Sequence, residues 1–208
     1  MTPKIIALLY FISLFFLFSC RPLAKVVYGL HKPRLESTRS ILKYAKNRDL
    51  DHVTILVPKD TASFLKLFYL FRATPDLYLF DSLGKSLLYS DNSTCNAPAS
   101  SVIDSLCNWM YKRNPNGKEL TQIFDCLKPL EKKDTLKFLE AQKMQVQFTG
   151  FITWTKYTGY LNKNHVKPWV KSLGNSRDCS WNAYLINMDF LDDLWSKEDV
   201  KGLKFKVD

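Results

Sequence analysis

The feature that most constrains this chain is an uncharged apolar run near its N-terminus. Residues 5–19 read IIALLYFISLFFLFS and lie between Lys4 and the pair Cys20-Arg21. Fifteen residues are fewer than the roughly 20 that a membrane-spanning helix needs, and a basic residue before such a run is typical of a signal peptide. We therefore predict that residues 1–19 are a signal peptide outside the folded domain, and that the chain is exported.

The end of this run indicates how the exported chain is held. Residues 17–20, Leu-Phe-Ser-Cys, resemble the lipobox of bacterial lipoproteins, in which a small residue precedes the acylated cysteine. The resemblance implies that Cys20 becomes a lipid-anchored N-terminus in the cell envelope. We expect it to face the periplasm, because residues 21–27 lack the acidic run of a surface-export signal. An uncleaved tilted anchor, or an ordinary signal peptide with Cys20 incidental, remains open.

Two further patterns bear on source and partners. Triplets such as Asp81-Ser82-Leu83 resemble the O-glycosylation signal of exported Bacteroidetes proteins, so a Bacteroidetes-type lipoprotein is expected. The chain has 30 Lys and Arg against 20 Asp and Glu, and loss of Lys4 with the signal peptide leaves a mature charge of +9. Basic residues beside a lipid anchor favour an anionic phospholipid surface. Export and the scatter of these residues argue against nucleic acid.

Alternating helical and extended patterns predict the architecture. Residues 20–35 carry no sustained periodicity and are predicted to be a tether, with the domain over residues 36–208. Predicted helices are one capped by Ser37 or Thr38 and those over residues 61–72, 99–111, 118–128, 134–143 and 162–173, the last kinked at Pro168. Predicted strands are residues 52–57, a hairpin over 73–90, and residues 144–154 and 183–190. This alternation predicts an α/β domain with a mixed sheet.

Two blocks of the sequence resemble thioredoxin-fold proteins. Residues 74–85, TPDLYLFDSLGK, are similar to the segment where that fold places a cis-proline before a strand and hairpin, so Pro75 is the expected cis-proline. Residues 151–163, FITWTKYTGYLNK, are similar to the strand and active-site turn written W-A-x-W-C-G-P-C-K. In the second block, Thr158 and Leu161 stand where the two cysteines should be.

The order of these blocks is reversed relative to thioredoxin, where the active-site turn precedes the cis-proline. The resemblance therefore implies a thioredoxin-like mixed sheet flanked by helices, permuted and with extra helices. The alternative is two half-units, residues 36–112 and 140–208, joined by a helical segment. We favour one domain, because a single sheet built from both blocks has enough strands to be covered on both faces.

Without the two cysteines, the redox activity of that family does not carry over. Thiol exchange needs a thiolate and a resolving thiol, and neither threonine nor leucine supplies one. The resemblance then implies a non-catalytic domain whose groove binds an extended peptide or a protein partner. The candidate partner-binding residues are Pro75, Trp154, Tyr157, Thr158 and Tyr160. A core role for the two matching aromatic residues, Trp154 and Tyr157, is an equal alternative.

The remaining cysteines give the alternative function. Cys95, Cys107, Cys126 and Cys179 allow three complete disulfide pairings, which the sequence does not distinguish. Cys95 precedes the start of a predicted helix, where the helix dipole lowers a thiol pKa, so a thiol-dependent enzyme of oxidoreductase or peroxidase type is the alternative. A purely structural envelope component is the third hypothesis. The three histidines lie far apart, and no metal or cofactor motif is present, so we expect no cofactor.

Overall fold

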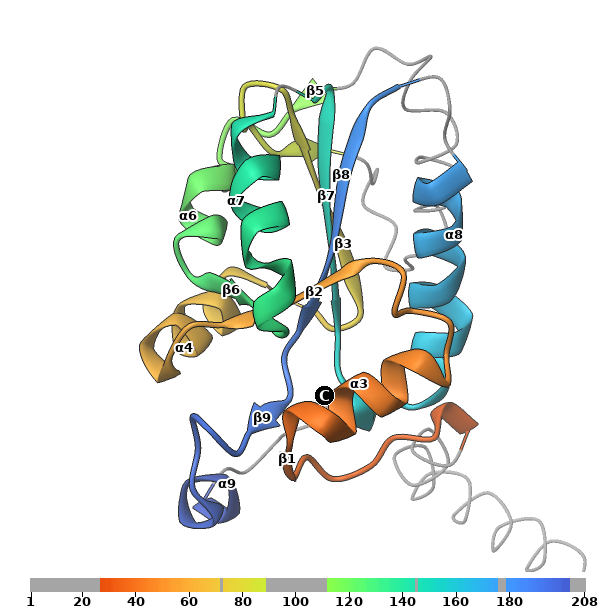
Figure 1. Ribbon diagram of the computed structural model, residues 1–208, viewed down its shortest axis with the longest axis vertical. Coiled ribbons are helices and arrows are strands. Elements are labelled where there is room, and N and C mark those ends of the chain that lie inside the picture. Colours follow the sequence, from red (N-terminus) through yellow and green to blue (C-terminus); the bar gives the residue numbers. More distant parts are fainter. Residues whose placement is uncertain (1–26, 72, 89–111, 145, 176–178, 203–208) are drawn as a thin grey trace, which may run out of the picture.

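A five-stranded mixed sheet forms the centre of the computed structural model (Figure 1), which describes residues 27–71, 73–88, 112–144, 146–175 and 179–202. Its strand order is β3-β7-β8-β2-β6. The strands are β2 (Thr54–Pro58), β3 (Asp76–Asp81), β6 (Leu127–Pro129), β7 (Phe148–Trp154) and β8 (Trp181–Asn187). The three central strands run parallel, and the two edge strands run antiparallel to their neighbours. The predicted α/β class with a mixed sheet is confirmed.

Helices cover both faces of this sheet (Figure 1). One face packs against α3 (Thr38–Lys46) and α8 (Lys167–Asn175). The other packs against α4 (Thr61–Leu70), α6 (Leu120–Phe124) and α7 (Thr135–Lys143). Successive residues of a strand point to opposite faces, so Leu185 joins the first apolar cluster whereas Tyr184 and Ile186 join the second. All seven residues of β7 are buried, as expected for a strand covered on both sides.

Two short strand pairs and a C-terminal helix also belong to the described fold. β1 (Leu35–Glu36) pairs in parallel with β9 (Phe190–Leu191), and β4 (Leu87–Leu88) pairs antiparallel with β5 (Lys112–Arg113). The short helix α9 (Lys197–Gly202) follows β9. The β1–β9 pair joins the first and last parts of the described chain.

Several local predictions are confirmed. Helix α3 begins after Ser37, whose hydroxyl accepts a hydrogen bond from Ser40 N, and α4 begins after Asp60, whose carboxylate accepts one from Ser63 N. The predicted hairpin is present as β3, a turn and β4, and Gly84 in the turn has φ +72°, which favours glycine. The helix predicted over residues 99–111 lies outside the described residues.

The helix predicted over residues 118–128 is wrong in its second half. Helix α6 ends at Phe124, and Leu127–Pro129 forms the edge strand β6 instead. Backbone pairing with β2 outweighs the local helical pattern there, and an edge strand tolerates the proline that has no N–H to donate. Asp134 occupies the cap position of α7 but makes no side-chain capping hydrogen bond.

Two further differences concern the helix around Pro168 and the predicted tether. The sequence predicts a helix over residues 162–173 with a kink at Pro168. In the structure, residues 162–166 form a π-helical turn, which is wider than an α-helical turn, and α8 follows it. The tether predicted through residue 35 is shorter than expected. His31 N donates to Tyr157 O at 2.9 Å and β1 pairs with β9, so the described residues before α3 are docked on the domain.

Candidate functional site

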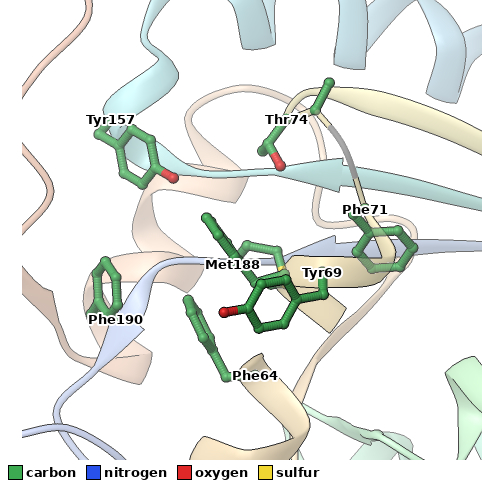
Figure 2. A pocket seen from close by; sticks show the side chains of 9 residues that line it. Phe64, Tyr69, Phe71, Thr74, Tyr157, Met188 and Phe190 are labelled. Carbon is green, nitrogen blue, oxygen red and sulfur yellow. The ribbon is translucent and has the colours of Figure 1, made fainter. Parts of the chain in front are cut away.

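An aromatic groove of about 370 Å³ is a concave candidate site among the described residues. It lies where the C-terminal end of β7, the loop before β3, helix α4 and the β8–β9 connection meet. Figure 2 shows side chains from these four segments directed towards one space. The lining residues are Phe64, Phe68, Tyr69, Phe71, Ala73, Thr74, Tyr157, Met188 and Phe190. None of these nine carries a charge, so the groove suits an uncharged apolar group.

Helix α4 supplies one wall of the groove. Phe64 is buried and packs against Phe190 with ring centroids 5.1 Å apart, which fixes the floor. Phe68 and Tyr69 point outward from the same helix and are 52% and 82% exposed. Large aromatic residues with that exposure give contact area at low cost in side-chain entropy. The helix thus buries one aromatic residue and presents two at the rim.

The loop before β3 supplies the opposite wall. The Thr74–Pro75 peptide bond is cis, as expected for Pro75, and Thr74 lines the groove. The Thr153 hydroxyl accepts a hydrogen bond from Asp76 N at 3.0 Å and lies 3.3 Å from Ala73 O. This side chain of β7 therefore holds both ends of the loop, and it links the two sequence blocks that resemble thioredoxin.

The turn after β7 holds its polar side chains inward. The Thr158 hydroxyl lies 2.7 Å from Thr155 O and 2.9 Å from Asn162 Oδ1. The Asn162 amide in turn donates to Thr155 O and to Tyr44 Oη. Thr158 is 4% exposed, so its hydroxyl is a structural hydrogen-bonding group within the turn. The structure gives this position no geometry for attack on a bound molecule.

The chain before α3 covers the outer side of this turn. Gly159 has φ +53°, and a Cβ atom there would lie 2.0 Å from Gly29 O. A Cβ atom on Gly29 would lie 2.7 Å from the Tyr160 ring. Two glycines therefore permit a close approach between residues 28–31 and the turn.

The predicted partner-binding residues divide between the groove and the core. Tyr157 lines the groove, and Pro75 is buried next to the lining residue Thr74. Trp154 is fully buried and stacks on Tyr44 with ring centroids 5.7 Å apart, which agrees with the core alternative for this residue. Thr158 is buried as well, and Tyr160 is 52% exposed but does not line the groove.

Sequence reasoning missed most of the groove. The predicted helix over residues 61–72 contains Phe64 and Phe68, and the predicted strand over residues 183–190 contains Met188 and Phe190, but none of the four is among the predicted partner-binding residues. The sequence of α4 did carry a signal for an additional surface. Leu65 and Tyr69 make the apolar surface of this helix wider than the single stripe of residues that packs against the sheet. The contribution from β8–β9 depends on tertiary packing and has no comparable signal.

A buried carboxyl lies between two of the groove residues. Asp189 is 3% exposed, and its Oδ2 accepts hydrogen bonds from Lys156 N and Asn187 Nδ2, both at 2.8 Å. Burial raises the pKa of Asp189 to about 6, although these two hydrogen bonds act in the opposite direction. Burial also raises the pKa of Tyr157. Asp189 thereby connects the segment from Met188 to Phe190, at the β8–β9 connection, to the turn carrying Tyr157.

The described residues offer little support for other kinds of site. They contain no group of three or more potential metal ligands, and no helix among them is long and apolar enough to cross a membrane. Cys126 is a buried free thiol, and Cys179 is disulfide-bonded. Cys20, Cys95 and Cys107 lie outside the described residues, so the lipid anchor and the alternative based on Cys95 stay predictions.

Comparisons with protein-family models, with curated proteins and with solved structures find no match.

Proposed function

We propose that this chain is a lipid-anchored envelope protein whose redox-inactive, thioredoxin-like domain binds a peptide or protein partner in the aromatic groove. The fold part of the proposal is supported by how the two resembling blocks meet. β3 of the first block and β7 of the second are neighbours in one sheet. The loop preceding β3 and the turn following β7 then contribute Thr74 and Tyr157 to the same groove.

The observation that carries the binding proposal is the composition of the groove. Four Phe, two Tyr, one Met, one Ala and one Thr line it, and two of the aromatic residues are at least half exposed. Burying apolar area of a ligand against such a surface is favourable, whereas a charged side chain would lose its hydration without a counter-charge. A large neutral side chain of an extended segment fits this chemistry.

The turn supports binding without redox chemistry. Thr158 and Leu161 replace the cysteines of the resembling motif, and the Thr158 hydroxyl is engaged within the turn. Residues 28–31 lie over the outer side of the same turn. What remains accessible is the groove on the other side, formed with α4.

The test measures binding of labelled extended peptides to the full chain by fluorescence anisotropy. The peptides differ at one central position, which carries Phe, Leu, Asp or Lys. We expect the Phe and Leu peptides to bind and the charged peptides to bind much more weakly. Phe68→Ser should weaken binding of the Phe peptide at least about fivefold, because exposed aromatic anchors dominate such interfaces.

Leu136→Ser is the matched control. Leu136 is 74% exposed on α7, outside the groove, so this substitution removes a comparable exposed apolar side chain from another helix. Both variants should keep the wild-type thermal transition. Equal binding of apolar and charged peptides, or equal effects of Phe68→Ser and Leu136→Ser, would contradict the proposed site.

A further inference from the structure

Among the residues that the structure describes, the positive charge is concentrated on one side of the sheet. Residues 27–50 and 156–175, which build the docked N-terminal segment, α3, the turn after β7 and α8, contain ten Lys and Arg against two acidic residues. The rest of the chain contains twenty against eighteen. Figure 1 shows α3 and α8 together on one face of the sheet, away from α4, α6 and α7.

Much of this charge is available to a partner. Arg39, Lys43 and Lys46 follow one another at helical spacing along the exposed side of α3, and Lys171 is exposed on α8. Among the described residues, none of these four has a carboxylate within ion-pair distance. By contrast, residues 118–144, which build α6, β6 and α7, carry six bases and five acids. The opposite layer is therefore nearly neutral.

The same side of the molecule carries exposed apolar groups. Val27, Tyr28 and Tyr160 are 60%, 45% and 52% exposed, and the contact between Gly29 and the Tyr160 ring brings them together. Tyrosine is favoured at membrane interfaces, because its ring is apolar and its hydroxyl remains hydrated. The side thus combines basic residues with interfacial aromatic residues.

This side is the one nearest the proposed anchor, because Val27, the first described residue after Cys20, lies on it. Cys20 precedes Val27 by seven residues, so even a fully extended chain spans at most about 25 Å between them. An acylated Cys20 would keep the Val27 end of the domain within that distance of the bilayer.

We infer that the α3–α8 side, defined by the exposed bases of these two helices and by Tyr28 and Tyr160, lies against anionic phospholipid headgroups. This inference rests on the proposed lipid anchor and adds the orientation of the domain on the membrane. Helix α4, which forms one wall of the groove, lies on the opposite face of the sheet from α3 and α8 (Figure 1). The source of negative charge is the lipid surface, because an acylated Cys20 would hold this side within about 25 Å of the bilayer, where exposed bases attract anionic headgroups.

The experiment uses the full acylated chain on vesicles of phosphatidylcholine, alone or mixed equally with phosphatidylglycerol. Lysine acetylation is followed residue by residue by mass spectrometry. We expect Lys43 and Lys171 to be protected on the mixed vesicles and reactive on phosphatidylcholine. High salt should remove the protection. Lys137 and Lys143, exposed on α7, should react equally on both vesicles.

A matched pair of variants tests the same face. Lys43→Gln/Lys171→Gln should reduce protection of the remaining lysines of this side, by roughly fivefold for each charge removed. Lys137→Gln/Lys143→Gln, which removes the same charge from α7, should change it little. Flotation with phosphatidylcholine vesicles, and its loss in Cys20→Ala, reports separately on the anchor.

Three outcomes would overturn the orientation. Anchored protein without selective protection on mixed vesicles would leave the anchor intact and refute this face. Equal effects of the two double variants would show that net charge alone matters. Protection of Lys43 by soluble polyglutamate, with none from phosphatidylglycerol, would assign the face to an acidic protein instead. A chain that fails to float on phosphatidylcholine, yet shows the selective protection on mixed vesicles, would refute only the anchor.

Discussion

At the scale of single residues, Asp189 links the stability of the fold to pH. It is buried beside the groove, and burial raises its pKa to about 6 from the ordinary 3.8. A raised folded-state pKa means that the fold favours the protonated acid. The contribution of Asp189 to stability is therefore complete below about pH 4 and is lost as the pH rises through about 6.

Asp189→Asn should remove this dependence. The Asn Oδ1 atom can accept the two hydrogen bonds that Asp189 Oδ2 accepts from Lys156 N and Asn187. The free energy of unfolding of the variant, relative to wild type, should rise by roughly 2 to 3 kcal/mol from about pH 4 to about pH 7. Urea titrations at a series of pH values measure it. Asp192→Asn, at an exposed neighbouring aspartate, is the control, and parallel pH profiles for wild type and Asp189→Asn would refute the argument.

At the scale of elements, the contact between the N-terminal segment and the turn after β7 depends on Gly159. Its φ of +53° is unfavourable for other residues, and a Cβ atom would lie 2.0 Å from Gly29 O and 2.9 Å from Tyr28 O. Because both neighbours are backbone atoms, relief requires the segment to move. Gly159→Ala should therefore cost more than about 2 kcal/mol, measured by chemical denaturation.

Gly174→Ala is the matched control for this substitution. Gly174 lies in α8, and a Cβ atom there would meet nothing within 4 Å. Alanine is the better helix former by about 1 kcal/mol, so this variant should be as stable as wild type or more so. If Gly159→Ala proved as stable as Gly174→Ala, the docked segment would not constrain the turn.

The elements also show what the sequence could and could not predict. Helices with a polar cap and one apolar side, such as α3, were predictable because local interactions determine them. The strand at Leu127–Pro129 was not, because its formation depends on pairing with a strand some 70 residues earlier. The docking of residues 28–31 depends on two glycines that are far apart in sequence, and a periodicity argument assigned the segment to a tether.

The candidate site follows the same division. The loop at Pro75 and the turn at Tyr157 carry local motifs, which made their neighbourhood predictable. The sequence does not show whether an aromatic residue of the motif is exposed or buried. Trp154 lies in the core because it stacks on Tyr44 of α3, which is far away in sequence. To predict that α4 forms a wall of the groove, one must know which side of that helix faces the sheet.

At the scale of the whole molecule, two ion pairs connect the N-terminal part of the domain to its C-terminal part. Lys156 Nζ donates to Glu36, and these side chains are 14% and 6% exposed. Lys167 Nζ donates to Asp49 at 2.6 Å, and these side chains are 48% and 73% exposed. The two pairs join similar stretches of chain, so they differ mainly in burial.

Burial decides how much each pair contributes to holding the two parts together. Burial raises the pKa of Glu36, but hydrogen bonds from Lys156, Ser40 and Arg34 outweigh it and hold the pKa below its ordinary value. The ionised Glu36 is therefore stabilising above its unfolded-state pKa, and this contribution is lost as the pH falls through its folded-state pKa. The exposed pair is screened by water and salt.

Double-mutant cycles on the two pairs should give different coupling energies. With Glu36→Gln and Lys156→Met, we expect a coupling of roughly 1 to 3 kcal/mol in the free energy of unfolding. Glu36→Gln leaves the largely buried Lys156 ammonium without its counter-charge, and Lys156→Met leaves the buried Glu36 with only the exposed Arg34 as an ion-pair partner. That coupling should persist in high salt and disappear in acid. With Asp49→Asn and Lys167→Met, no measurable coupling should remain at high salt. Equal couplings with the same salt dependence would show that burial of Glu36 and Lys156 does not strengthen the connection between the two parts of the domain.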